Sequence, residues 1–252
     1  MKNKVTFLII FTLLFYSCLR QNVEGKLGFT ASSHEDANNV EISQLPVKVF
    51  IRNGILSYYG NKIGSTPFNN ISELLSLYTE QELHSVTELY ISKINLQEID
   101  SLDRLPNLED LTLGACKITS MKGLEMAPKL KGLNLSQNPI GKIEYLETLK
   151  DIEEIYIANS QLKKIEGIEG LQKLRELDLS GNQLTKIEGL SDLPSLERLS
   201  LSGNQIVDYS GLLEIKTIKE ISITSLENIV DDNAVAVFTE WNKRFPAQAL
   251  EW

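Results

Sequence analysis

Hydrophobic residues recur with a fixed period along most of this chain. In the segment LRELDLSGNQLTKIEGLSDLPS, from Leu174 to Ser195, leucine or isoleucine stands at positions 1, 4, 6, 11, 14, 17 and 20. The pattern restarts at Leu196, so the period is 22 residues. A fixed period of this length indicates an architecture built from stacked repeats. Six full repeats and a partial seventh start at Val86, Leu108, Leu130, Ile152, Leu174, Leu196 and Ile218.

The order of polar and apolar residues within a repeat predicts its local structure. The first residues, LRELDLS in the clearest repeat, alternate between apolar and polar, which is typical of a short β-strand. The later residues, TKIEGLSDLPS, are expected to return on the opposite side and to add their apolar side chains to the same core. One repeat cannot bury its own apolar face, so neighbours stack and their strands lie in parallel about 4.8 Å apart. The pattern predicts an α/β fold, a solenoid with a curved parallel sheet on its concave side.

The length and spacing of the repeat resemble those of a known family. The segment KIEGLSDLPSLERLSLSGNQI carries the resemblance most clearly, to the leucine-rich repeats of bacterial internalins and of a eukaryotic phosphatase-regulating subunit. The resemblance covers residues 86–228 and implies a leucine-rich repeat solenoid. It also implies a surface-exposed bacterial protein, such as an adhesin or host-interaction protein, that binds a host or neighbouring protein on its concave face.

The N-terminal segment MKNKVTFLIIFTLLFYSC follows a different pattern. Two lysines precede an apolar run from Val5 to Tyr16, which is too short to span a membrane and predicts a signal peptide over residues 1–17. The Ser17-Cys18 pair resembles the lipobox of bacterial lipoproteins, which implies that Cys18 is acylated and becomes the mature N-terminus. The alternative is an ordinary signal peptide that is cleaved further along the chain.

Residues 18–39 show little apolar periodicity and predict a lipidated N-terminus followed by a flexible tether. Such an anchor would hold the protein in the bacterial cell envelope. We expect the outer membrane or the cell surface rather than the inner membrane.

The segments on both sides of the repeats are expected to form helical caps over the ends of the core. In residues 40–85, Asn70 and Glu73 have the spacing of a capping box, and the apolar residues of 70–78 fall on one helical face. In residues 229–252, the expected helix has Asp231 or Asp232 as its N-cap and stops at Pro246. Its buried stripe caps the core or, alternatively, forms a partner site. The two predicted stripes are Ile71, Leu74, Leu75 and Tyr78, and Ala234, Val237, Phe238, Trp241 and Phe245.

Residues 45–63 contain two β-type runs around Asn53-Gly54, a combination typical of a β-hairpin. This hairpin extends the sheet past the first repeat or forms a separate binding element.

Position 9 of the repeat holds Asn138, Asn182 and Asn204, whose amides can bond the backbone of adjacent coils. The second repeat has Cys116 there, which we expect to be a small buried hydrophobe rather than a nucleophile.

Positions 2, 3, 5, 7 and 8 are expected to point outward from the sheet. Position 5 includes Tyr90 and Tyr156, an amphipathic residue type favoured at binding hot spots. Position 7 is always small, which allows a partner close to the sheet or reflects tight curvature. Position 3 is acidic in five of seven repeats, and position 2 alternates in sign. The residues at position 3 are Glu88, Asp110, Gly132, Glu154, Glu176, Arg198 and Glu220.

Two hypotheses account for the acidic column at position 3. It is a solvated ladder that keeps the sheet soluble, or it is an acidic groove that attracts a basic partner protein. Under the second hypothesis, the partner-binding residues are Tyr90, Tyr156, Glu88, Asp110, Glu154 and Glu176.

The overall charge narrows the class of partner. The formal net charge of −9 argues against nucleic acid or an anionic membrane surface as the main partner. Two cysteines and two histidines make a disulfide framework or a metal site unexpected, and we find no catalytic or cofactor-binding motif. We therefore expect a monomeric protein-binding module without cofactor or metal, and not an enzyme. The alternatives are a structural envelope lipoprotein without a dedicated partner, or an enzyme with an unrecognised carboxylate site.

Overall fold

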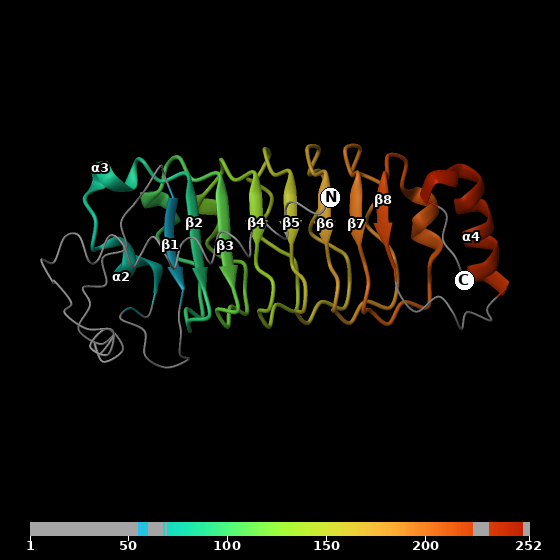
Figure 1. The fold of residues 1–252 in the computed structure, drawn as a ribbon, viewed down its shortest axis with the longest axis horizontal. Coiled ribbons are helices and arrows are strands. Elements are labelled where there is room, and N and C mark those ends of the chain that lie inside the picture. The colour runs from blue at the N-terminus through green and yellow to red at the C-terminus, as the bar shows by residue number, and fades with distance from the viewer. Residues whose placement is uncertain (1–54, 60–67, 69, 224–231, 249–252) are drawn as a thin grey trace, which may run out of the picture. The chain divides into compact units, whose positions relative to one another are not determined.

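The computed structural model describes residues 55–59, 68, 70–223 and 232–248 of the 252-residue chain. Figure 1 shows eight strands side by side in chain order, and each pairs in parallel with the next. The predicted solenoid with a parallel sheet is confirmed. The strands are β1 (Ile55–Tyr59), β2 (Glu88–Ser92), β3 (Asp110–Gly114), β4 (Gly132–Asn134), β5 (Glu154–Tyr156), β6 (Glu176–Asp178), β7 (Arg198–Ser200) and β8 (Glu220–Ser222).

The register of the sheet follows the 22-residue period. Leu89 of β2 lies beside Leu111 of β3, and Leu111 lies beside Leu133 of β4. Each position of the repeat therefore forms one column across the strands. Because side chains alternate along a strand, the columns at positions 3 and 5 lie on the face opposite to position 4.

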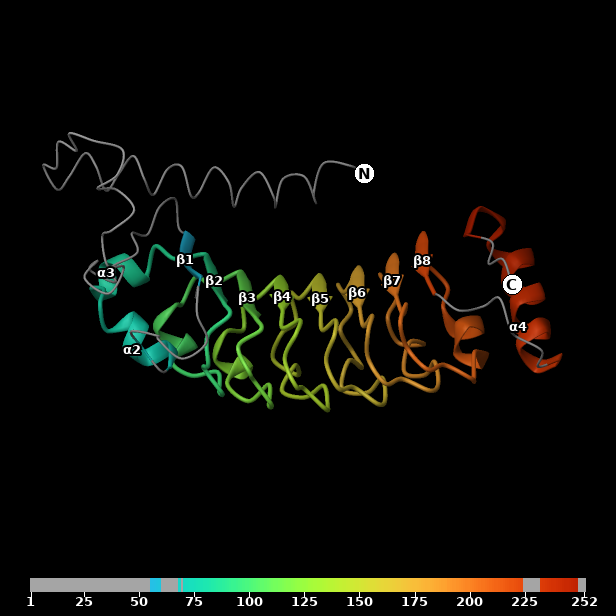
Figure 2. The ribbon, with the colours of Figure 1, turned by 60° about the horizontal axis from the view of Figure 1, so that its bottom comes forward.

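The core is filled from both sides of each coil. Leu177 and Leu179 of the strand side and Leu184 and Ile187 of the returning side are fully buried. In Figure 2 the row of strands is lower in its middle than at its ends, so the sheet lies on the concave side. The returning segments include the short 3-10 helices η3 (Leu102–Arg104), η4 (Leu124–Met126) and η5 (Ser210–Glu214).

Three repeats have an asparagine at position 9, and its side chain forms hydrogen bonds to the preceding coil. The Asn138 Oδ1 atom accepts hydrogen bonds from the backbone N–H groups of Cys116 and Ile118, at 2.8 and 3.1 Å. Its Nδ2 atom donates to carbonyl oxygens of the preceding coil and of its own coil. Asn182 and Asn204 make equivalent bonds, as predicted.

Position 8 belongs to a turn rather than to the outer face of the strand. Its φ angle lies between 53° and 71° in all six full repeats. This left-handed conformation suits Gly181 and Gly203 and is uncommon for most other residues. The chain already turns there, so position 8 does not belong to the strand, although its residues are exposed or partly exposed as the predicted outward direction requires. The residues concerned are Lys93, Ala115, Gln137, Asn159, Gly181 and Gly203.

Two short helices, α2 (Ile71–Leu75) and α3 (Glu80–Leu83), precede β2 and form the N-terminal cap (Figure 1). The Asn70 Oδ1 atom accepts from the Glu73 N–H at 2.7 Å, and the four predicted apolar residues are buried. The helix expected over residues 70–78 is shorter than predicted and ends at Leu75, and a capping box formed by Thr79 and Glu82 begins α3. Asp100 of the first repeat accepts from the first two N–H groups of α2 and so joins the cap to the solenoid.

The sheet extends one strand beyond the first repeat. β1 pairs in parallel with β2, and Leu56 lies fully buried beside Leu89. The Asn53-Gly54 turn of the predicted hairpin, its first arm, the signal peptide, Cys18 and the tether lie outside the described residues.

The C-terminal cap is helix α4 (Asp232–Arg244), which supports the capping role of the aromatic stripe. Phe238 packs edge-on against Tyr209, with ring centroids 4.8 Å apart, and the Arg244 guanidinium donates to the Leu213 carbonyl oxygen at 2.7 Å. Four residues of the predicted stripe are buried, whereas Phe245 follows the helix and is only partly buried. Pro246 starts a 3-10 helix, η6 (Pro246–Gln248), and Asp231 lies outside the described residues.

Candidate binding face

The candidate site is the outer face of strands β2 to β6, here called the sheet face and made of positions 3, 5 and 7. Tyr90 and Tyr156 stand three strands apart on it, about 14 Å at the usual strand spacing. Tyr90 is 36% exposed and Tyr156 is partly exposed. They are the two aromatic side chains among these positions.

Each tyrosine is tied to the acidic residue at position 3 of its own strand. The Tyr90 hydroxyl donates to Glu88 Oε2 at 3.0 Å, and the Tyr156 hydroxyl donates to Glu154 Oε2 at 2.9 Å. Partial burial, together with the neighbouring carboxylates, raises the pKa of both phenols. Both tyrosines are therefore neutral hydrogen-bond donors at physiological pH, with their rings held along the strand.

Only small side chains stand between the two tyrosines. At position 5 these are Thr112 of β3 and Asn134 of β4, and the Asn134 side chain bends to accept from the Ser136 N–H at 3.0 Å. Asp178 of β6 makes the same bond to the Ser180 N–H at 2.9 Å. These polar groups thus support the turn that follows the strand.

The side chain of Asp110 lies across the neighbouring strand β4. A Cβ atom built on Gly132 would meet Asp110 Oδ1 at 2.1 Å, so the carboxylate occupies the space that the glycine leaves open. Partial burial, followed by the charges of Glu88, Glu154 and Glu109, raises the pKa of Asp110. In the part of the chain that the structure describes, the Asp110 carboxylate makes neither a hydrogen bond nor an ion pair.

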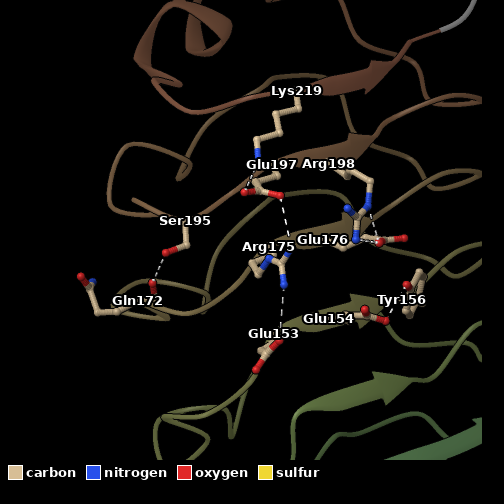
Figure 3. Close-up of polar contacts among 10 residues, drawn as sticks. All are labelled: Glu153, Glu154, Tyr156, Gln172, Arg175, Glu176, Ser195, Glu197, Arg198 and Lys219. Atoms are coloured by element: carbon tan, nitrogen blue, oxygen red, sulfur yellow. Dashed lines mark hydrogen bonds and ion pairs between the residues drawn. The ribbon is translucent and has the colours of Figure 1, made fainter.

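One carboxylate of the acidic column, on β6, is neutralised by an arginine of the next strand. Arg198 of β7 pairs with Glu176 of β6 through both its Nε and Nη2 atoms (Figure 3). Glu176 was predicted to belong with the other acidic residues, but the structure places it in this ion pair. Within β2 to β6, three carboxylates of the column, those of Glu88, Asp110 and Glu154, have no cationic partner among the described residues.

The alternating charges at position 2 form ion pairs along one flank of the sheet. Lys131 Nζ lies 2.7 Å from Glu109 Oε2, and Arg175 lies 3.9 Å from Glu153 and 3.4 Å from Glu197 (Figure 3). Lys219 approaches Glu197 at 2.5 Å, which with Arg175 lowers the pKa of Glu197. Exposed pairs of this kind add little stability. They do balance the flank, so the negative charge of the sheet face comes mainly from position 3.

Comparisons with known proteins agree with this geometry. A family model described as Leucine Rich repeats (2 copies) matches residues 172–214, which contain β6 and β7. The chain contains leucine-rich repeats, stacked into the solenoid described above. None of the curated proteins matches its sequence.

Two solved structures of bacterial proteins resemble this chain. A leucine-rich repeat protein of Leptospira interrogans is 28% identical with a TM-score of 0.54, over 63% of this chain and 41% of that chain. An internalin (inlF) of Listeria monocytogenes is 25% identical with a TM-score of 0.49, over 64% of this chain and 54% of that chain. The chain spans about half the length of these proteins or less. Leucine-rich repeat proteins generally serve as non-enzymatic scaffolds for protein interaction.

The remaining candidates in the described residues are the thiol of Cys116, a metal site and a membrane-spanning helix. Cys116 is fully buried, and burial raises the pKa of its thiol to about 11, so it is a poor nucleophile. No group of three or more His, Cys, Asp or Glu side chains suited to a metal ion occurs within residues 55–59, 68, 70–223 and 232–248. Within the same ranges, none of the helices has the length and apolar character needed to cross a membrane.

The six residues predicted to bind a partner all lie on the sheet face, but they do not form one group. The structure places Tyr90, Tyr156 and three of the acids on one face without a cation, whereas Glu176, although close to Tyr156, is paired with Arg198. The roles of Gly132 and Arg198 were not predicted from the sequence. Their signal was present, since they interrupt the acidic column at position 3 with a missing side chain and a positive charge.

Proposed function

We propose that this leucine-rich repeat protein is a protein-binding module of a bacterial cell envelope that binds its partner on the sheet face. The observation that carries the proposal is the combination of two tyrosines and three carboxylates without a cationic partner among the described residues, around a stretch of small side chains. Aromatic anchors with adjacent polar groups are the usual composition of a binding hot spot. The likeness in fold to a bacterial leucine-rich repeat protein supports the bacterial origin.

The partner is expected to be basic where it contacts this face. The carboxylates of Glu88, Asp110 and Glu154 repel one another and weaken the free sheet, and a positive partner would relieve that repulsion. Their field would also attract a basic surface before contact, an effect that appears mainly in the association rate.

The first experiment uses the purified chain as bait to find a saturable partner, followed by binding kinetics of variants. Tyr156→Ala should weaken binding by about 1 kcal/mol or more, chiefly through faster dissociation. Tyr145→Ala, a tyrosine of the returning side, is the matched control and should bind as the parent chain does. Equal binding by both folded variants would move the site away from the sheet face, and the 45–63 segment would be tested next.

A charge variant distinguishes long-range electrostatic attraction of the partner from packing at the interface. Glu154→Gln keeps a hydrogen-bond acceptor for the Tyr156 hydroxyl but removes one charge, so the association rate should fall, and the difference should shrink with added salt. The control Glu147→Gln removes an exposed charge on the returning side and should have little effect. If no saturable partner is captured at all, a structural envelope lipoprotein becomes the better hypothesis.

We propose further that a lipid on Cys18 anchors the protein to the envelope, at the outer membrane or cell surface. The proposal rests on the apolar signal segment that ends at Ser17-Cys18. Cys18→Ala should move the protein to the soluble fraction, because stable attachment requires acyl chains at this residue. Fractionation after signal cleavage measures this, and Cys116→Ala serves as the control. A processed Cys18→Ala protein that still sediments with membranes would refute the lipid anchor.

A further inference from the structure

The chain contains its own example of arginine recognition at position 3. Arg198 of β7 lies in register beside Glu176 of β6, and two of its guanidinium nitrogens contact the same carboxylate. A side chain at this position therefore reaches the carboxylate of the adjacent strand along the surface of the sheet, as Figure 3 shows.

The same column lacks a side chain at Gly132, between two acidic residues. Gly132 lies in register with Asp110 on one side and with Glu154 on the other. Asp110 leans over β4 into the space that the missing side chain leaves, and Lys131, the cation that acts on its carboxylate, is held by Glu109 on the flank. The Asp110 carboxylate thus lies over Gly132, and Glu154 stands in register on the other side, where an arginine could reach both as Arg198 reaches Glu176.

We infer that the partner supplies this missing side chain, an arginine whose guanidinium lies over Gly132 and bonds to Asp110 and Glu154. The inference rests on the proposed function and specifies the chemistry of its partner. A guanidinium has five donors in one plane and can bond carboxylates on two sides, whereas an ammonium acts as a point charge. Tyr90 and Tyr156 flank the position and offer ring surfaces to the neighbouring residues of the arginine-bearing segment.

The probe is a blocked tri-arginine peptide, compared with tri-lysine of equal charge. Binding to the full chain is followed by backbone amide NMR shifts at low salt. Tri-arginine should shift the amides of Asp110, Gly132 and Glu154 and bind about fivefold more tightly than tri-lysine, because its donors are bidentate. Equal affinities, or shifts spread over the acidic surface without these three, would overturn the inference.

The deciding variant places the arginine in the chain itself. Gly132→Arg should pair with Asp110 and Glu154 and abolish the binding of tri-arginine. It is expected to fold, because the atom that meets its Cβ is the mobile end of the Asp110 side chain. Gly141→Arg adds the same charge where a Cβ meets nothing within 4 Å, and it should bind the peptide nearly as the parent chain does. Equal losses in both variants would mean that overall charge, not this position, controls binding.

A second variant covers the case in which Gly132→Arg does not fold. The double change Asp110→Asn with Glu154→Gln keeps the side-chain shapes and should reduce tri-arginine binding at least about tenfold, since both charged acceptors are lost. Unchanged binding by this folded variant would overturn the inference. Binding of the natural partner to these variants distinguishes the proposed function from the arginine inference. If Tyr156→Ala weakens partner binding but Gly132→Arg does not, the sheet face binds without this arginine. If neither change matters, the proposed function fails.

Discussion

At the scale of single residues, Asp110 shows how the sheet face differs from a surface selected only for stability. Its carboxylate stands between Glu88 and Glu154 in one column, and the lysine beside it is paired elsewhere. Like charges on neighbouring strands destabilise a sheet. The same chain neutralises this column with Arg198 two strands beyond Glu154, so the acidic end is a property of particular positions and not of the fold.

Asp110→Asn should therefore stabilise the free protein at neutral pH. The pKa of Asp110 is raised on folding, so the folded state penalises the charged form. That penalty is present above the raised pKa and disappears as the pH falls below the ordinary aspartate value of about 4. The free energy of unfolding should rise by about 0.2–1 kcal/mol at pH 7, and the gain should vanish on acidification. Urea unfolding at several pH values measures this.

Asp151→Asn is the control of opposite sign. Lys173 bonds this carboxylate at 2.6 Å and lowers its pKa, so its charge is favourable in the folded state. That variant should be destabilised at pH 7, with the loss disappearing as the pH falls through the lowered pKa. Two variants that changed stability in the same direction would contradict the electrostatic interpretation of Asp110.

The contacts that the sequence did not predict belong to residues whose side chains can point toward either adjacent strand. Glu176 and Arg198 are both apparent in the sequence, but a side chain at position 3 can point toward either adjacent strand. Only its rotamer decides whether the charge is paired. The left-handed turn at position 8 was hidden for a similar reason, because Lys93 and Ala115 adopt a backbone conformation that their residue types do not indicate.

At the scale of elements, the strength of the periodic signal decided what could be predicted. The C-terminal helix was predictable because its apolar residues recur at helical spacing before Pro246, and the structure buries four of them. The N-terminal cap was predicted less well. Helix α2 ends within the expected segment, and Thr79 and Glu82 form a complete capping box that begins α3 just after it, a local signal that is easily missed beside a short apolar pattern.

Helix α4 is expected to stabilise the last coil through Phe238. This side chain is fully buried against Tyr209 of the last full repeat, so Phe238→Ala should reduce the free energy of unfolding by about 3–5 kcal/mol. Hydrogen exchange should increase first in η5 and β8. Val235→Ala on the exposed side of the same helix is the control and should change stability by less than about 0.5 kcal/mol. Comparable losses in both variants would mean that helix formation, not the Phe238 contact, stabilises the cap.

At the scale of the whole molecule, stability is shared between neighbouring coils. The backbone bonds of the sheet join adjacent repeats, and each position 9 asparagine also bonds a residue of the preceding repeat, 20 to 25 residues away in sequence. This arrangement was predictable from the sequence, because a 22-residue period with one apolar face allows burial only by stacking. It also implies that damage to one coil should extend to its neighbours.

Leu177→Ala tests this coupling. Leu177 is fully buried in β6, between Ile155 of β5 and Leu199 of β7, so truncation should reduce the free energy of unfolding by about 2–5 kcal/mol. Since each coil depends on its neighbours, hydrogen exchange should also rise in β5 and β7. Val207→Ala, at a residue that is 74% exposed, provides the comparison and should leave both quantities nearly unchanged. An increase in exchange confined to β6 would show that the coils are energetically independent, and an unfolding midpoint equal to that of Val207→Ala would show that Leu177 contributes no core packing.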